Sequence, residues 1–165
     1  MDKELKLWLE NHSIKYILHK HAAVFTVPEA KIHCGHIPGT HCKNLFLRNK
    51  KTDQFYLVTI PHEKRLDLKE FRKIIGAPKV RFAGSDDLCA ILGVTPGAVT
   101  PLGLVNDTSN RTIFIVEEEV WNADEICCHS NINTETLQIP KYDFKKLIKA
   151  TKNQIEVKKL PYLEE

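Results

Sequence analysis

The sequence predicts a single α/β (α+β) domain in which a mixed β-sheet is flanked by helices. Segments with helical and with strand periodicity interleave along the chain, while several strand pairs are separated by connections too short for a parallel crossover. A length of 165 residues suits one domain with its own core, so residues 1–165 are treated as one unit. The 42% hydrophobic and 27% charged residues are typical of a globular chain.

The N-terminal half alternates between helix and strand patterns. Leu5, Trp8 and Leu9 recur at helical spacing. Thr26 and Glu29 form a capping box that predicts the start of a second helix. The elements predicted here are a helix over 3–11, a strand over 14–18, a helix over 27–33, and hairpin-like strands over 44–49 and 54–60.

The C-terminal half has a second capping pair and two glycine stop signals. Asp67 and Glu70 predict a helix start, and Gly76 ends that helix because glycine readily adopts the left-handed conformation. Gly93 ends a later short helix in the same way. The elements predicted here are helices over 68–75 and 85–92, strands over 111–118 and 135–139, a helix around 144–148, and an edge strand over 155–160.

Composition limits the cellular setting. No apolar run approaches the roughly 20 residues of a membrane-spanning helix, and the first ten residues, MDKELKLWLE, lack the apolar stretch of a secretory signal. We therefore expect a cytoplasmic protein with no membrane partner. Five irregularly spaced cysteines indicate reduced thiols rather than a disulfide framework. The net charge of +3 is low for a protein that grips a long duplex. The local cluster of Lys43, Arg48, Lys50 and Lys51 suits a protein that binds a single-stranded end or a small phosphorylated ligand.

The stretch GTHCKNLFL (39–47) places Lys43 at the mouth of an apolar strand. Lys43 could bind a phosphate, lower the pKa of the neighbouring Cys42 thiol, or be there incidentally. Adjacent residues of a strand face opposite ways, which argues against a nucleophilic Cys42 and favours a buried or half-buried free thiol.

Cysteine and histidine side chains crowd the same region, and they suit zinc as ligands: His33, Cys34, His36, His41 and Cys42. The spacing is poor, because the chain has no C-x-x-C and no second ligand pair follows at a finger-like distance. A zinc-stabilised interaction domain is therefore kept only as an alternative.

Two further segments could form a site. In GVTPGAVTPLGLVNDT (93–108), Gly97 and Pro101 bracket a loop of restricted shape that could present backbone groups to a ligand or could simply be a rigid connector. In CHSNINTET (128–136), an extended backbone would place His129, Asn131 and Asn133 on one face, where they could bind a small polar group. A turn rich in Asn and Thr is the alternative for this segment.

Together with HAAVFTVPEA and EKRLDLK, these segments resemble the YbaK/ProX family of aminoacyl-tRNA deacylases, and most closely its free-standing prolyl-tRNA editing branch, known as PrdX or ProXp-ala. The likeness runs roughly from His21 to Thr151, and the five motifs occur in the same order as in the family. It implies one domain built on a strongly curved, mixed, mostly antiparallel and barrel-like sheet with helices around it. It also implies that no metal or other cofactor is needed.

The resemblance implies hydrolysis of the ester that joins a mischarged amino acid to the 3′ acceptor end of tRNA(Pro), with Ala-tRNA(Pro) as the expected substrate. A proline site cannot exclude the smaller alanine by binding alone, which is why such editing is needed. Two alternatives stay open within the same fold: a Cys-tRNA(Pro) deacylase, and a non-catalytic module that binds the tRNA end. A partnership with prolyl-tRNA synthetase is also open.

By position, the resemblance assigns Lys43 to the phosphate and ribose of the terminal adenosine, the Gly97–Pro101 backbone to the ester and attacking water, and His129 to the aminoacyl group. The substrate's own 2′-hydroxyl is expected to assist, because the chain has no recognisable Ser/His/Asp elbow. Ser130 stands where the branch commonly has proline, which is what keeps the non-catalytic alternative open. The remaining residues assigned to substrate binding are Asn44, Thr100, Pro101, Asn131 and Asn133.

Overall fold

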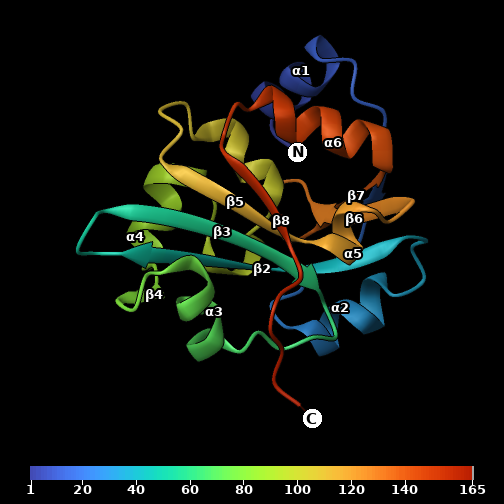
Figure 1. The fold of residues 1–165 in the computed structure, drawn as a ribbon. Helices are drawn as coiled ribbons and strands as arrows, with labels where there is room; N and C mark the ends of the chain where they lie inside the picture. The colour runs from blue at the N-terminus through green and yellow to red at the C-terminus, as the bar shows by residue number, and fades with distance from the viewer. Residues whose placement is uncertain (165) are drawn as a thin grey trace.

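Short helices and eight strands alternate in the computed structural model, which describes residues 1–164 (Figure 1). The helices are α1 (Lys3–Asn11), α2 (Val27–Cys34), α3 (Leu68–Ile75), α4 (Ser85–Asp87), α5 (Glu118–Trp121) and α6 (Lys141–Ala150). The strands are β1 (Ile17–Lys20), β2 (Thr40–Asn49), β3 (Gln54–Pro61), β4 (Val80–Phe82), β5 (Thr112–Glu117), β6 (Glu125–His129), β7 (Glu135–Pro140) and β8 (Ile155–Lys158). A π-helical turn (Leu88–Leu92) and two 3₁₀ turns (Pro96–Ala98 and Pro101–Asn106) complete the list.

The strands form one mixed sheet in the order β1-β7-β6-β2-β3-β5-β8, with β4 also paired to β2. The β2–β3, β2–β4, β6–β7 and β1–β7 pairs are antiparallel, whereas β2–β6, β3–β5 and β5–β8 are parallel. The predicted mixed sheet flanked by helices is confirmed. The sheet does not close into a barrel, because β1 and β8 remain its two outer strands.

The two faces of the sheet bury different cores. Alternation along β2 sends Phe46 to a core shared with α1 and α6, and sends Leu47 to a core shared with α3. Figure 1 shows α1 and α6 on one side of the sheet and α3 on the other. The same alternation places Lys43 on the α3 face and Asn44 on the opposite face.

The predicted helix boundaries are confirmed at the caps. The side chain of Thr26 accepts a hydrogen bond from the Glu29 N–H, and that of Asp67 accepts one from the Glu70 N–H. Gly76 adopts φ +65° at the end of α3, as a left-handed helix stop requires. Local signals were therefore sufficient for these elements.

Strand boundaries differ more from prediction. The predicted strand over 14–18 lies at Ile17–Lys20, and β2 begins at Thr40 rather than at residue 44. Cys42 and Lys43 extend β2 by pairing with β3, and Thr40 and His41 extend it further by parallel pairing with β6, a contact that no local pattern encodes. Neither β4 nor α5 was predicted.

One edge of β2 has an interruption in its pairing. On the side away from β3, β6 pairs with Thr40 and His41, and β4 pairs with residues 47–49. Between these two strands, the edge is approached by loops: the Val99 carbonyl accepts from the Asn44 side chain at 3.2 Å. Lys43 and Asn44 lie in this interruption, where an open space can form beside the strand.

Candidate functional site

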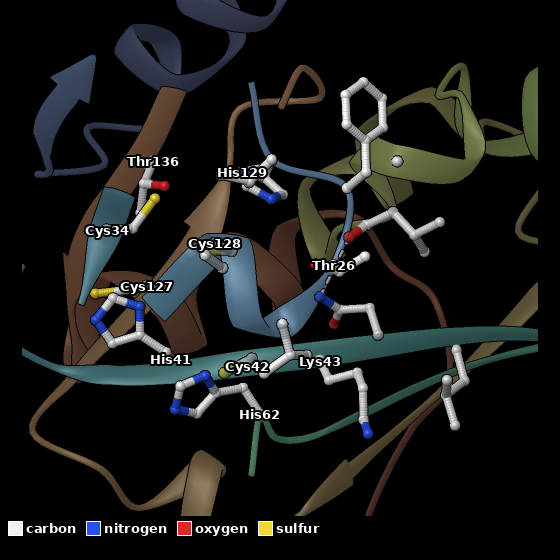
Figure 2. Close-up of a pocket in the computed structure, with 18 of the residues that line it drawn as sticks. Thr26, Cys34, His41, Cys42, Lys43, His62, Cys127, Cys128, His129 and Thr136 are labelled. Atoms are coloured by element: carbon white, nitrogen blue, oxygen red, sulfur yellow. Dashed lines mark hydrogen bonds between the residues drawn. The ribbon is translucent and has the colours of Figure 1, made fainter. Parts of the chain in front are cut away.

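A cavity of about 290 Å³ lies beside the interrupted edge of β2 (Figure 2). Its walls come from residues 24–30, β2, the 96–99 turn and β6. Four of the predicted site residues line it: Lys43, Asn44, Gly97 and His129. The structure therefore brings together side chains from segments that are far apart in the sequence.

Lys43 supplies a cationic group at the cavity. Its side chain makes no ion pair with any residue of the described 1–164 range. Burial, and then the positive charge of Arg65, lower the pKa of Lys43. Figure 2 shows Lys43 and His129 on opposite sides of the cavity. An ammonium with no carboxylate partner is available to an anionic ligand.

Asn44 lines the cavity but has both ends of its amide bound to the protein. Its Nδ2 donates to the Val99 carbonyl at 3.2 Å, and its Oδ1 accepts from the Thr59 hydroxyl at 2.6 Å. These bonds hold the 96–99 turn against β2 and so set one wall of the cavity.

Gly97 lies in the 3₁₀ turn Pro96–Ala98, directly beneath the Phe25 ring. A Cβ built at Gly97 would lie 2.9 Å from Phe25 Cδ1 and 3.4 Å from Asn133 Nδ2. A side chain therefore fits only if Phe25 moves. Phe25 itself is 69% exposed and lines the cavity. Its sequence motif carried the family resemblance, but sequence reasoning did not single out this aromatic ring.

Thr100 and Pro101 are buried and do not line the cavity. The Thr100 hydroxyl donates to the His129 carbonyl at 2.8 Å and accepts from the Leu102 N–H at 3.3 Å. Thr100 therefore ties the loop after Gly97 to the end of β6. In this structure it positions the site rather than touching what the cavity would hold.

His129 ends β6, and its Nδ1 lies 3.1 Å from the Glu135 carbonyl oxygen. A carbonyl oxygen only accepts, so Nδ1 carries the proton and Nε2 keeps a lone pair. Burial lowers the pKa of His129. The hydrogen bond to Glu135 raises this pKa in part, and the nearby His21 ring lowers it further. His129 is thus a neutral acceptor at physiological pH.

The extended backbone assumed for Asn131 and Asn133 is wrong. Residues 130–134 form the turn between the antiparallel strands β6 and β7, and Asn131 has φ +69°. Asn tolerates this left-handed conformation better than most residues with a side chain. Asn131 is buried, and its Oδ1 has no hydrogen-bond partner among residues 1–164. Asn133 donates to the Val24 carbonyl at 3.0 Å, and neither side chain lines the cavity.

The sulfur groups of the cavity are free thiols. Burial raises the pKa of Cys127 to about 12 and raises those of Cys42 and Cys128 strongly. A thiol held this far from ionisation is a poor nucleophile, and Cys42 is a free, half-buried thiol, in line with the interpretation from the sequence. Within the described part of the chain, no group of three or more His, Cys, Asp or Glu residues is placed to hold a metal ion.

Residues 21–147 match the sequence model of the family described as the aminoacyl-tRNA editing domain, which covers most of the chain. The chain belongs to this editing family. The likeness inferred from its motifs is therefore confirmed.

Curated relatives of this editing domain carry prolyl-tRNA names. This chain is 34% identical to "Prolyl-tRNA synthetase associated domain-containing protein 1" of Danio rerio, over 92% of this chain and 83% of that protein. It is also 34% identical to "Prolyl-tRNA editing protein ProX" of Acetoanaerobium sticklandii, over 88% of each chain.

A solved structure shares the fold of this editing domain. It is described as a candidate trans-editing enzyme for prolyl tRNA synthetase, and it superposes with a TM-score of 0.72 at 21% identity, over 97% of this chain and 98% of that one. At this identity the likeness shows the fold alone. Across residues 1–164, no helix combines the length and the apolar character needed to cross a membrane.

Proposed function

We propose that this editing domain hydrolyses the ester of mischarged tRNA(Pro), with Ala-tRNA(Pro) as its substrate, in the cytoplasm. One observation carries the proposal: the unpaired Lys43 ammonium, the Gly97 turn and the neutral His129 all line the same cavity. Membership of the editing family and the prolyl-tRNA names of its relatives support the choice of tRNA.

In the proposed complex, Lys43 binds the phosphate of the terminal adenosine and so orients the ester that follows it. The backbone N–H of the Gly97 turn is the candidate donor to the carbonyl oxygen as negative charge develops there. The exposed Phe25 ring over Gly97 offers the adenine a flat apolar surface. The protein's main contribution is then the positioning of the reacting groups.

The reaction adds a water oxygen to the acyl carbon and breaks the bond to the ribose 3′-oxygen, which leaves with a proton. The lone pair on His129 Nε2 can accept a hydrogen bond from the water or from the α-ammonium of the aminoacyl group. The adjacent 2′-hydroxyl of the substrate relays the proton to the 3′-oxygen. The products are free alanine and intact tRNA.

Ser130, the residue behind the non-catalytic alternative, is accommodated without displacing His129. Its hydroxyl is buried and donates to Glu135 Oε2 at 2.6 Å, while His129 keeps its bond to the Glu135 carbonyl and its place in the cavity wall. The replacement of proline by Ser130 is therefore compatible with a catalytic site.

The direct test measures deacylation of tRNA(Pro) charged with alanine, cysteine, serine or proline. We expect alanine to be released faster than proline by roughly 10- to 200-fold, the range that a small apolar pocket can discriminate. Equal loss of the alanine and proline esters would overturn the proposal. Preferential loss of cysteine would instead support the Cys-tRNA(Pro) alternative, and binding of tRNA without release would support the non-catalytic one.

A further inference from the structure

A second hollow, of about 440 Å³, adjoins the candidate site at Lys43. Lys43 and Leu45 line both spaces, which follows from their position on the α3 face of β2 at the interrupted edge. The rest of the second hollow comes from residues 65–69 at the start of α3, from β4, and from Leu163. Residues 65–69 belong to EKRLDLK, a motif to which the sequence analysis gave a helix cap at Asp67 but no part in the site.

Positive charge dominates this hollow. Its lining contains three cations, Lys43, Arg65 and Lys69, against one carboxylate, Asp67. The Asp67 carboxylate accepts from the Glu70 N–H at 3.2 Å and so caps α3. None of the three cations has an ion-pair partner within residues 1–164. The positive charge of Arg65 contributes to the lowered pKa of Lys43, so these two cations repel each other. An anion bound between them would offset this repulsion.

An exposed aromatic ring completes the lining. Phe82 on β4 is 63% exposed, although it lies opposite the fully buried Leu47 in the strand pairing. A flat apolar ring beside unpaired cations is the combination by which proteins bind single-stranded nucleic acid, because the base stacks and the phosphate is neutralised.

We propose that this second hollow binds the penultimate nucleotide of the tRNA 3′ end, with Phe82 against its base and Arg65 near its phosphate. The inference rests on the proposed function. The phosphate assigned to Lys43 joins the last two nucleotides of the tRNA. Because Lys43 lies at the junction of the two spaces, the aminoacyl adenosine enters the first cavity and the preceding nucleotide must leave on the other side, where the second hollow opens.

The test compares two minimal substrates, 3′-O-alanyl-adenosine 5′-phosphate and the corresponding alanyl dinucleotide with a cytidine before the adenosine. For the wild-type chain, kcat/KM should rise by roughly 5- to 150-fold when the cytidine is added, the range that one stacked base provides. The ratio of kcat/KM for the dinucleotide to kcat/KM for the mononucleotide should fall toward one in Phe82→Ala and Phe82→Leu. In Arg65→Ala this ratio should fall only partly.

Lys64→Ala is the matched control, because Lys64 is the exposed neighbour of Arg65 but does not line the hollow and lies over the Tyr162 ring instead. This variant should keep the wild-type ratio. Phe82 is largely exposed, so its variants should keep the wild-type melting temperature.

The outcomes separate this inference from the proposed function. If the wild-type chain hydrolyses both substrates equally well, or Phe82→Leu keeps the full ratio, the second hollow does not bind the nucleotide although the deacylase assignment stands. If the wild-type chain hydrolyses neither ester, the proposed function fails, and titration with unacylated pCpA and pA decides the inference. Tighter binding of pCpA that is lost in Phe82→Ala would support it, and equal binding of the two probes would overturn it.

Discussion

The Thr100 hydroxyl donates a 2.8 Å hydrogen bond to the His129 carbonyl, and thereby joins the loop after Gly97 to the end of β6. Thr100 is fully buried, so its hydroxyl cannot turn to water instead. This one contact couples the two segments that carry the candidate catalytic groups.

Replacing Thr100 with valine should therefore lower both stability and activity. The change keeps the volume but leaves the His129 carbonyl and the Leu102 N–H without their partner, which costs about 1–3 kcal/mol in the free energy of unfolding. Denaturant titration and deacylation kinetics would measure the two losses. Thr100→Ser should recover most of both. A valine variant as stable and active as the wild-type chain would show that the bond is dispensable.

Lys43→Met should reduce deacylation while preserving the fold. The methionine fills a similar volume but cannot bind a phosphate, and a hydrogen bond to a charged group is worth about 1.5–3 kcal/mol, or roughly a 10- to 150-fold loss in kcat/KM. The free energy of unfolding should stay level or rise, because the half-buried cation loses solvation without gaining an ion pair. Lys50→Met, on the exposed turn of the β2–β3 hairpin, is the matched control. Full activity of Lys43→Met would contradict the phosphate assignment.

Gly97→Ala should impair the site in a way that depends on Phe25. The new Cβ would lie 2.9 Å from the Phe25 ring, which is exposed and can swing aside, so the stability loss should stay below about 1 kcal/mol. Activity should fall because the ring is displaced from the cavity mouth. In the Phe25→Ala background, the alanine at position 97 no longer contacts an aromatic ring. The two substitutions should then be non-additive in a double-mutant cycle of kcat/KM, and simple additivity would show that they act independently.

The pH profile should report the burial of His129. Its pKa is lowered, so the neutral form that accepts a hydrogen bond persists below the ordinary histidine pKa of about 6.5. After subtraction of spontaneous hydrolysis, kcat/KM should be level near neutral pH and should fall only below about pH 6.5. His129→Gln should lack this fall, and His36→Gln, at an exposed histidine outside the cavity, should retain it. An acid limb centred above the ordinary pKa would contradict the assigned environment.

The same shift has a consequence for stability. Between the lowered pKa and about 6.5, the unfolded chain binds a proton at residue 129 that the folded chain does not. The stabilising contribution of the neutral His129 is therefore present above about pH 6.5 and is lost as the pH falls through the folded pKa. The free energy of unfolding should decline less steeply with acid in His129→Gln than in the wild-type chain.

Thiol chemistry should distinguish Cys89 from the cavity cysteines. Cys89 is exposed, whereas burial raises the pKa of Cys42, Cys127 and Cys128. Brief treatment with iodoacetamide at neutral pH should modify Cys89 first, as peptide mass spectrometry would show, and should leave deacylation intact. Rapid alkylation of Cys42 with loss of activity would revive the nucleophile alternative.

Features that depend on neighbouring residues could be predicted from the sequence. The caps at Thr26 and Asp67 and the stop at Gly76 involve contacts within a few residues, so composition and spacing were sufficient. Motif order along the chain was likewise sufficient for the family. The two asparagines after His129 show the limit. An extended strand and a turn were both compatible with their pattern, and pairing of β6 with β7 selected the turn.

By itself, then, the sequence determined the family, the mixed sheet with its helices, and the presence of a lysine, a glycine turn and a histidine suited to one site. Only the tertiary structure decided that β2 pairs with β6 and β4 and leaves its edge open between them, because those partners come from distant parts of the chain. That open edge places Lys43 between two hollows and beside Arg65. No local pattern encodes this position, since it is set by the register of three strands at once.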